Sequence, residues 1–393
     1  MKQNPVVLIV TSKFGDGHVK VAEAIELAFN NRGFRRVHTI DMLAEVYPRV
    51  NEFFRRFYLS GSVLSQEIYG LVYSLTSKMN PGHPLGSWVH SMGKRQVQEI
   101  LDKIRPDIII HTFPYLAAAQ LIKETGRPVP SFTILKDYVL HGRWLHPHTT
   151  KYFLAAESVK PAFLEAGISE EALMVSGIPI RSDFEQLQDR EDLFDKYGLS
   201  INRRYLLLAA GAYGVLSNIR GLIQSVVDKS DFDVIVVCGN NHKLRTATED
   251  LFGQNNRVHV LGYTDKMHEW MSIASCLLTK AGGITLTEAI AQSLPVLVYR
   301  PLPGQEVGNA ESLASQGIID VVNNEDQFIR KLQQLEQRSY REVKQQLMKS
   351  FSRKSSSELI VSEVLQVIEA RQPVARHTKP RITEGQATTI QGL

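Results

Sequence analysis

Short apolar runs alternate with amphipathic helical patterns from one end of the chain to the other. In the first half the runs are VVLIV (6–10), DIIIHTF (107–113), PSFTIL (130–135), KYFLAA (151–156) and LMVSGIP (173–179). In the second half they are RYLLLAAG (204–211), DVIVVCG (233–239), RVHVLGY (257–263), SCLLTKAGG (275–283) and LPVLVYRP (294–301). Near-continuous apolar strands separated by helices are typical of parallel sheets covered on both faces. The pattern predicts an α/β protein with doubly wound, Rossmann-like domains.

The predicted strands form two groups, which indicates two domains. The boundary is expected within GIPIRSDFEQLQDRED (177–192), which contains a proline and leads into a charged helix before the strand at 204. We therefore expect an N-terminal domain over 1–180, a C-terminal domain over 181–355 and a separate helix over 356–371. The composition of 372–393, with prolines, glycines, threonines and scattered cations, is typical of a poorly ordered tail.

Residues 49–80 interrupt the alternation with an aromatic-rich helical pattern. One interpretation is a helix pair that faces the core of the first domain. The other is an amphipathic surface that enters a membrane interface or lines an acyl-chain groove. The candidate residues for this surface are Phe53, Phe54, Arg55, Arg56, Phe57, Tyr58 and Tyr69. The nearby cations Lys94, Arg95, Lys103 and Arg105 would strengthen its binding to anionic lipid.

The composition indicates a globular protein but does not identify its ligand. The 393 residues are 43% apolar and 22% charged, with a net charge of +4, which is typical of a globular protein with a sizeable core. The mildly basic balance fits a membrane surface or an anionic ligand and demands neither. Cys238 and Cys276 lie in apolar runs, so buried thiols are expected rather than a disulfide. We expect no signal peptide, transmembrane helix, metal site or nucleic-acid partner.

The first predicted strand leads into FGDGH (14–18) and then directly into a helical pattern. His18 therefore follows Gly15 and Gly17 at the point where the chain leaves a strand and enters a helix. One interpretation is a tight turn that carries a solvent-exposed histidine. The other is a reactive imidazole at a helix N-terminus, held over a ligand. A short glycine motif alone does not decide between them.

The segment TKAGGITLTE (279–288) has the composition of a phosphate-binding loop. Gly282 and Gly283 would let a diphosphate approach the backbone, and the N-terminus of the following helix would bind it. Thr285 adds a hydroxyl donor, and Glu288 would suit the two hydroxyls of a ribose. The alternative is a helix start with a capping box from Thr285 to Glu288.

The next predicted loop, PLPGQEVGNAE (301–311), is unusually polar for the end of a buried strand. Ligands of open α/β sheets bind beyond the carboxyl ends of the strands. Gln305, Glu306 and Asn309 are therefore expected to face the same crevice as Glu288, where Gln305 and Glu306 could bind sugar hydroxyls.

Eight blocks, in order, carry a family resemblance over about residues 5–370. They are FGDGH, HTFP (111–114), KDYVLHGRW (136–144), SGIPI (176–180), AGAYGV (210–215), LGYTDKMHEWM (261–271), GGITLTE (282–288) and PGQEVGNA (303–310). Together they resemble the processive diacylglycerol glucosyltransferases of Gram-positive bacteria. These enzymes are related to plant monogalactosyldiacylglycerol synthases and, more distantly, to the peptidoglycan glycosyltransferase that makes lipid II.

The resemblance implies a GT-B fold of glycosyltransferase family 28, with two Rossmann-like domains that face a cleft. The N-terminal domain would take the lipid acceptor, and the C-terminal domain would take UDP-glucose. The implied reaction transfers glucose to 1,2-diacylglycerol with inversion and without a metal or cofactor, and repeats on the product. The products would be membrane glycolipids that also anchor lipoteichoic acid. The protein would act as a peripheral protein on the cytoplasmic side of the cell membrane.

The resemblance also assigns roles by motif position. His18 would be the general base or its close partner, with Asp137 and His141 on the acceptor side, and Trp144 belongs to the same motif. In the implied donor site, Gly15 and Gly17 approach the sugar and its phosphates, and Gly211 and Gly214 lie near the diphosphate. The phosphates are bound by Gly282, Gly283 and Thr285, the ribose by Glu288, and the uracil lies beside Gly262 and Tyr263. The hexose is recognised by Gln305 and Glu306, with Asn309 beside them.

Two departures from the family pattern affect these roles. The family usually has proline where this chain has Ala281, and threonine where it has Lys136. Ala281 should leave the phosphate contacts intact. Lys136 places a cation beside Asp137, which weakens a carboxylate as a base. A further acidic pair, in DFD (231–233), resembles a metal-binding DxD motif, but it precedes its strand and is expected to lie away from the crevice.

Several alternatives remain open from the residues alone. The donor could be UDP-galactose, or UDP-N-acetylglucosamine with another lipid acceptor, and an epimerase could share the fold. A non-enzymatic alternative is a UDP-sugar-sensing regulator of a cell-division protein partner. Because binding a UDP-sugar needs no base, the presence of His18 favours an enzyme.

Overall fold

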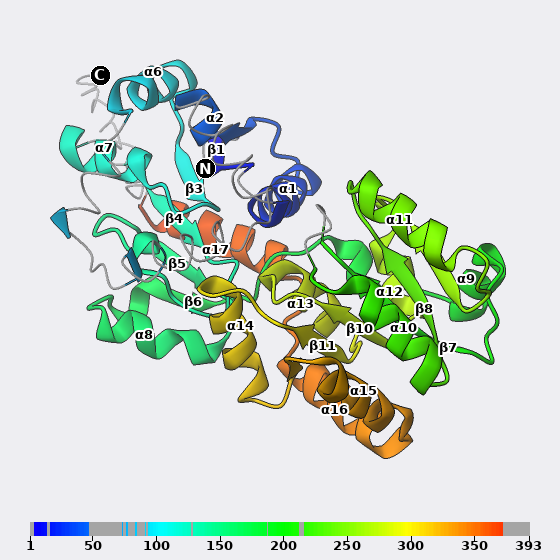
Figure 1. The fold of residues 1–393 in the computed structure, drawn as a ribbon. Helices are drawn as coiled ribbons and strands as arrows, with labels where there is room; N and C mark the ends of the chain where they lie inside the picture. The colour runs from blue at the N-terminus through cyan, green and yellow to red at the C-terminus, as the bar shows by residue number, and fades with distance from the viewer. Residues whose placement is uncertain are drawn as a thin grey trace, which may run out of the picture.

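The computed structural model describes residues 4–13, 16–46, 73, 76–77, 83–84, 91, 93–126, 129–186, 188–211 and 216–371. Within these residues the chain forms two six-stranded parallel sheets, each flanked by helices (Figure 1). The expected fold class of two doubly wound α/β domains is therefore confirmed.

The first sheet belongs to the N-terminal half and has the strand order β2-β1-β3-β4-β5-β6. Its strands are β1 (Val7–Thr11), β2 (Val37–Asp41), β3 (Ile108–His111), β4 (Ser131–Ile134), β5 (Lys151–Leu154) and β6 (Leu173–Val175). The helices described around it are α1 (Asp16–Asn31), α2 (Met42–Val46), α6 (Lys94–Ile104), α7 (Ala117–Thr125) and α8 (Lys160–Glu165).

The second sheet belongs to the C-terminal half and has the order β12-β11-β10-β7-β8-β9. Its strands are β7 (Arg204–Ala209), β8 (Phe232–Val237), β9 (Val258–Leu261), β10 (Cys276–Thr279), β11 (Val296–Tyr299) and β12 (Asp320–Val322). Its helices are α9 (Arg190–Tyr197), α10 (Ile219–Lys229), α11 (His242–Phe252), α12 (Met267–Ile273), α13 (Gly283–Ala291), α14 (Gln305–Ala314), α15 (Glu325–Glu336) and α16 (Arg338–Phe351).

The central strands are buried along their whole length, which explains their continuous apolar sequences. Every residue of β1, β3, β4, β8, β10 and β11 is buried. Helices on both faces of a parallel sheet remove each side of the strand from water, so polar alternation is lost. Cys238 and Cys276 are buried free thiols, as expected.

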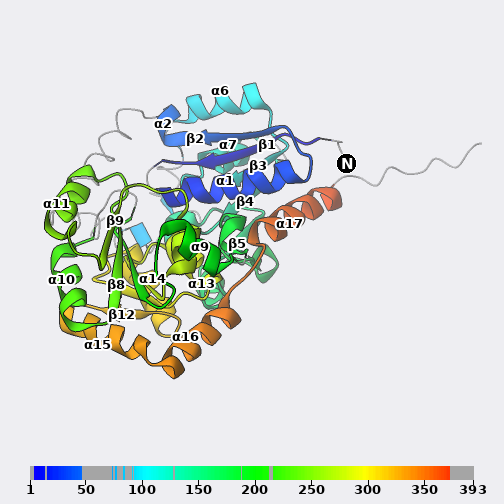
Figure 2. The ribbon, with the colours of Figure 1, turned by 90° about the vertical axis from the view of Figure 1, so that its right-hand side faces the viewer.

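The last described helix, α17 (Ser356–Arg371), returns from the C-terminal domain to the N-terminal one. It lies along α1 in both ribbon views (Figures 1 and 2). The Arg32 side chain at the end of α1 donates to the Glu358 carboxylate at 2.8 Å and to the Ser362 hydroxyl at 2.6 Å. The chain therefore crosses between the domains twice, once before α9 and once before α17.

The strand orders define one switch point in each sheet. In the first sheet the strand order reverses between β1 and β3, because β1 connects to β2 on one side and β3 connects to β4 on the other. The loops after β1 and β3 therefore lead in opposite directions along the sheet. In the second sheet the equivalent position lies between β7 and β10. Ligands of doubly wound sheets bind at such points, beyond the carboxyl ends of the strands. The carboxyl ends of β1 and β10, at Thr11 and Thr279, lie at these points, and the next described helices along the chain begin at Asp16 and Gly283.

Candidate active site

His18 lies in the first turn of α1, at the switch point of the first sheet, and is only 8% exposed. Its Nδ1 is 2.5 Å from the carbonyl oxygen of Thr112, which follows β3. A carbonyl oxygen can only accept, so Nδ1 carries the proton and Nε2 keeps its lone pair. The Thr112 hydroxyl donates in turn to the His18 carbonyl at 3.1 Å. The interpretation of His18 as a solvent-exposed histidine is therefore wrong.

The surroundings of His18 keep its imidazole neutral. Burial, and next the charge of Lys136, hold the pKa of His18 well below its ordinary value of 6.5. The bond to Thr112 acts in the opposite direction, and Arg143 adds to the lowering. The rings of Phe113 and Trp144 lie 4.8 and 6.1 Å from the imidazole, centroid to centroid. A fixed, neutral imidazole with an available Nε2 can accept a proton at neutral pH.

The N-terminus of α13 supplies the second half of the site. The helix begins at Gly283, with Gly282 in the N-cap position and no side chain that caps it. Thr285 is thus already inside the helix, so the alternative of a Thr285–Glu288 capping box is wrong. Because the N-cap residue Gly282 has no side chain to cap the first N–H groups of α13, these groups can bind an anion such as a phosphate.

Glu288 lies one turn further along α13 and is 2% exposed. Its carboxylate is 3.8 Å from the Lys20 ammonium of α1, so the two domains meet here. Burial raises the pKa of Glu288, and the charges of Lys20 and Arg181 partly oppose that rise. A buried carboxylate at this depth can accept hydrogen bonds from the hydroxyl groups of a bound ligand.

The loop before α14 and the start of that helix face the same interface. Glu306 is 9% exposed, accepts from the Leu302 N–H at 3.2 Å and lies 3.3 Å from the Lys280 ammonium. Asn309 is fully buried, and its amide donates to the Ala281 carbonyl at 3.1 Å. Asn309 therefore ties the α14 segment to the loop after β10, as expected for residues that face one crevice.

Asp137, predicted on the acceptor side, connects the domains directly. One oxygen of its carboxylate accepts from Gln305 at 2.7 Å and from Asn309 at 3.0 Å, both on α14. The other oxygen accepts from the Lys136 ammonium at 3.1 Å. In this arrangement Gln305, expected to read the hexose, is bound by the opposite domain. We call Lys136, Asp137, Gln305 and Asn309 the interdomain cluster.

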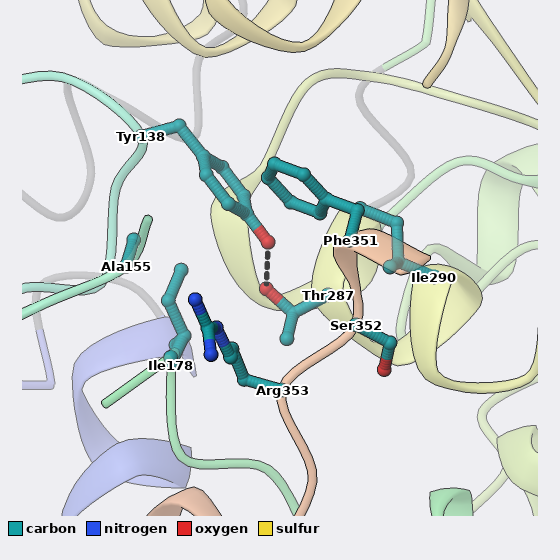
Figure 3. Close-up of a pocket in the computed structure, with 9 residues that line it drawn as sticks. Tyr138, Ala155, Ile178, Thr287, Ile290, Phe351, Ser352 and Arg353 are labelled. Atoms are coloured by element: carbon teal, nitrogen blue, oxygen red, sulfur yellow. Dashed lines mark hydrogen bonds between the residues drawn. The ribbon is translucent and has the colours of Figure 1, made fainter. Parts of the chain in front are cut away.

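Tyr138 makes two further contacts across the cleft. Its backbone N–H donates to the side-chain oxygen Oδ1 of Asn309 at 2.8 Å, and its hydroxyl lies 2.8 Å from the Thr287 hydroxyl. Figure 3 shows the second contact in a pocket walled by both domains and by residues 351–353. The sequence motifs did not indicate this contact, and its only signal was the place of Tyr138 and Thr287 beside Asp137 and Glu288.

His141 and Trp144 lie in the N-terminal domain, in the segment that follows β4, with His141 as the N-cap of the short helical turn Gly142–Trp144. The ring of His141 packs on Tyr73 at 4.4 Å, and its Nε2 lies 3.2 Å from the Tyr73 carbonyl oxygen. Burial lowers the pKa of His141 to about 4. Trp144 is buried beside His18, so it lines the site and does not face a membrane surface. A Cβ added to Gly304 would meet Tyr73 at 3.0 Å, so residue 73 reaches both domains.

The remaining predicted donor residues divide into described and undescribed positions. Gly211 has a positive φ of 78° at the end of β7, a conformation that favours glycine. Gly262 lies beside Arg245, and Tyr263 is 66% exposed. Gly17 is packed between Ile284 and Lys136. The predicted positions Gly15, Gly214, Phe53, Phe54, Arg55, Arg56, Phe57, Tyr58 and Tyr69 lie outside the described residues.

The DFD segment is occupied by structural ion pairs. Asp233 accepts hydrogen bonds from the guanidinium groups of Arg203 and Arg257. It lies at the amino-terminal ends of the strands of the second sheet, where it pairs with Tyr205 of β7. No group of three or more potential metal ligands occurs among the described parts of the chain.

Two family models match this chain, one in each half, in the same order as the two sheets. The family model for "Monogalactosyldiacylglycerol (MGDG) synthase" matches residues 18–180, and that for "Glycosyltransferase family 28 C-terminal domain" matches residues 214–364. The processive diacylglycerol beta-glucosyltransferase of Bacillus licheniformis is 35% identical over 369 residues, which are 93% of this chain and 96% of that protein. The same-named protein of Bacillus cytotoxicus is 37% identical over 336 residues, 85% and 86% of the two chains.

Solved structures share the architecture at low sequence identity. Acinetobacter baumannii MurG has a TM-score of 0.63 at 13% identity, covering 92% of this chain and 100% of that one. The S. aureus MnaA–UDP co-structure has a TM-score of 0.62 at 13% identity, covering 94% and 99%. At such identities the likeness shows the fold alone, a GT-B pair of Rossmann-like domains.

Proposed function

This chain belongs to the family of the processive diacylglycerol beta-glucosyltransferases, and from that membership and its cleft we propose that it transfers glucose from UDP-glucose to 1,2-diacylglycerol. The observation that carries the proposal is the close packing of the first turn of α1, which holds His18, against the first turn of α13: a Cβ on Gly17 would lie 3.3 Å from Cγ1 of Ile284. A UDP-sugar on α13 would present its reacting carbon toward the domain that holds the base. The family relatives named above carry this activity in their names.

In the proposed reaction, the acceptor hydroxyl oxygen attacks the anomeric carbon from the side opposite UDP. The bond between that carbon and the phosphate oxygen breaks, and its electron pair leaves with UDP. The proton of the hydroxyl moves to Nε2 of His18, which the Nδ1–Thr112 bond orients. This displacement inverts the anomeric centre. A positioned base of this kind contributes typically about 10²–10⁴-fold to the rate.

We assign the departing UDP to the α13 N-terminus and its ribose to Glu288. Backbone N–H groups and the helix dipole would stabilise the charge that develops on the phosphate, so the proposed step needs no metal. We assign the hexose to Gln305 and Glu306 at the start of α14. Gln305 can serve the hexose only after it exchanges its bond with Asp137, so we propose that donor entry rearranges the interdomain cluster.

For the acceptor, we propose repeated addition to the glycolipid product at a membrane surface. Among the residues that the structure describes, no helix is both long and apolar enough to cross a bilayer. We propose peripheral attachment on the cytoplasmic face through the 49–80 segment and the basic residues of α6, because a diacyl substrate remains in the bilayer. Lys94, Arg95 and Lys103 of α6 would add attraction to anionic lipid.

The proposal is tested by product analysis with a panel of donors and acceptors. Purified protein is incubated with labelled UDP-glucose, UDP-galactose or UDP-N-acetylglucosamine and with diacylglycerol in anionic vesicles, and the lipids are separated by thin-layer chromatography. We expect mono- and higher glucosyldiacylglycerols from UDP-glucose only. Glycolipid from another donor would change the assigned sugar. UDP-glucose binding without any glycolipid would favour a UDP-sugar-sensing regulator.

A further inference from the structure

Tyr138 belongs to the N-terminal domain, but two of its polar groups bind the C-terminal domain, and the proposed chemistry does not use it. The residue follows β4 and is buried, and its hydroxyl lies 2.8 Å from the Thr287 hydroxyl on α13 (Figure 3). Its backbone N–H donates to Oδ1 of Asn309 on α14 at 2.8 Å. One residue of the N-terminal domain therefore contacts both helices that carry the predicted donor site.

The direction of the bond between Tyr138 and Thr287 follows from a second bond of Thr287. The Thr287 hydroxyl lies 2.7 Å from the Gly283 carbonyl oxygen, one turn earlier in α13, and donates to it because a carbonyl oxygen can only accept. A hydroxyl group has a single hydrogen, so Thr287 can only accept from Tyr138. Burial raises the pKa of Tyr138, so its hydroxyl keeps the proton that it donates. The three groups thus form one directed chain, from the Tyr138 hydroxyl through the Thr287 hydroxyl to the Gly283 carbonyl.

This chain ends on a peptide unit of the proposed phosphate site. The first hydrogen bond within α13 runs from the Leu286 N–H to the Gly282 carbonyl at 3.0 Å. The N–H groups of residues 283–285 come before it, and they are the groups to which the diphosphate is assigned. The Gly283 carbonyl and the Ile284 N–H belong to the same peptide unit. A hydrogen bond accepted by the carbonyl polarises this unit and strengthens its N–H as a donor.

The second contact of Tyr138 orients the side chain that binds the loop before α13. Because the Tyr138 N–H can only donate, the Asn309 atom that faces it is the amide oxygen. The amide nitrogen of Asn309 is thereby turned toward the Ala281 carbonyl, to which it donates at 3.1 Å. The carbonyls on both sides of Gly282, those of Ala281 and Gly283, are therefore each bound by a side chain that Tyr138 contacts.

We propose that Tyr138 is a positioning residue of the donor site, whose hydroxyl sets the Gly283–Ile284 peptide for binding the diphosphate. Because this hydroxyl comes from the N-terminal domain, the phosphate-binding loop is complete only when the domains are closed. By reciprocity, a bound diphosphate favours the closed cleft, which excludes the water that would hydrolyse the donor. This inference rests on the proposed function for one point, the assignment of UDP to the start of α13.

The test measures the affinity of the full-length protein for UDP and for uridine by calorimetry. Tyr138→Phe removes the hydroxyl and keeps the ring. We expect this variant to bind UDP about 3- to 10-fold more weakly, which corresponds to the loss of one neutral hydrogen bond. Its affinity for uridine should be unchanged, because uridine carries no phosphate. If the hydroxyl only supported the fold, the variant would lose affinity for both ligands alike.

Thr287→Val tests the same bond from the opposite domain. Valine has the shape of threonine without the hydroxyl, so the variant leaves the buried Tyr138 hydroxyl without its acceptor and should weaken UDP binding more than Tyr138→Phe does. Adding Tyr138→Phe to Thr287→Val should weaken UDP binding no further, because the chain is already broken. Thr287→Ser keeps the hydroxyl and should retain the affinity of the wild type.

Tyr340→Phe is the matched control, because the Tyr340 hydroxyl binds Asp320 of β12, the outermost strand at one edge of the second sheet. This control should leave both affinities unchanged. Wild-type affinity for UDP in Tyr138→Phe, or additive losses in the double variant, would overturn the inference. The proposed function would then still stand if the wild type makes glycolipid. A wild type that binds no UDP would overturn both, and one that binds UDP without making glycolipid would overturn the proposed function alone.

Discussion

Gly283→Ala should separate the two domains while leaving each domain folded. A Cβ at residue 283 would lie 2.0 Å from the Lys136 carbonyl oxygen and 3.1 Å from an Asp137 carboxylate oxygen. Cβ atoms essentially never approach another heavy atom within 3.0 Å, and a backbone oxygen cannot rotate away. The facing segments must therefore move apart by at least about 1.4 Å to reach an ordinary contact distance of 3.4 Å or more.

That displacement is large compared with the tolerance of the contacts beside it. The bonds from Gln305 and Asn309 to Asp137 are 2.7 and 3.0 Å long, so a further separation of about 1.4 Å takes both past hydrogen-bonding distance. Hydrogen bonds to charged groups contribute about 1.5–3 kcal/mol each, so losing two costs about 3 kcal/mol or more, roughly a hundredfold in the closed population. Alanine also favours the helix by up to about 1 kcal/mol, but that gain stays within the C-terminal domain.

The assay combines kcat/KM for glucosyl transfer, thermal unfolding and the radius of gyration from small-angle X-ray scattering. For Gly283→Ala we expect an expanded particle and roughly a hundredfold lower kcat/KM, with an unchanged or slightly raised Tm. Gly282→Ala is the matched comparison, because a Cβ there meets nothing within 4 Å and its φ of −73° suits alanine. That variant should keep the compact particle, whatever it does to donor affinity. A compact, fully active Gly283→Ala protein would refute the reasoning.

Three further predictions concern binding, stability and metals. Glu288→Gln should weaken UDP binding about 10- to 100-fold in calorimetry, since hydrogen bonds to a buried carboxylate are worth about 1.5–3 kcal/mol, whereas the exposed Glu249→Gln should have no effect. The pKa of His141 is about 4 in the folded protein and 6.5 when unfolded, so its contribution to stability is present above pH 6.5 and is lost as pH falls toward 4. The free energy of unfolding, measured with urea, should fall by up to about 3 kcal/mol between pH 6.5 and pH 4. His141→Asn should reduce the slope of this free energy against pH. An equal slope in the variant would exclude His141 as the source of the loss. Chelation with EDTA should leave glucosyl transfer unchanged, and a metal-dependent rate would contradict the assignment of UDP to α13.

The sequence predicted the central strands well because burial on both faces leaves a strong apolar signal. It missed β2 and β12, which are the outermost strands at one edge of each sheet. In β2, VHTID is only partly buried and reads as a polar segment. β12 has three residues, DVV, and its Asp320 binds the ammonium groups of Lys331 and Lys344. Short, half-exposed strands lack the apolar continuity on which the prediction depended.

For the site, motifs identified the loops but not the contacts between them. His18, Glu288 and Asn309 were each expected at the carboxyl ends of strands, where the structure has them. The bonds of Asp137 to Gln305 and Asn309 join residues more than 160 positions apart, and nothing in local spacing encodes such pairs. The sequence indicated only that Lys136 places a cation beside Asp137, and the structure has their side chains in contact at 3.1 Å.

The most direct test of the central claim is the rate of glucosyldiacylglycerol formation by His18→Ala, measured together with its affinity for UDP. If Nε2 of His18 takes the acceptor proton, transfer should fall about 10²–10⁴-fold while the Kd for UDP stays within a few fold of the wild type. Weakened UDP binding with an intact turnover number would contradict the claim and would assign His18 to the donor instead.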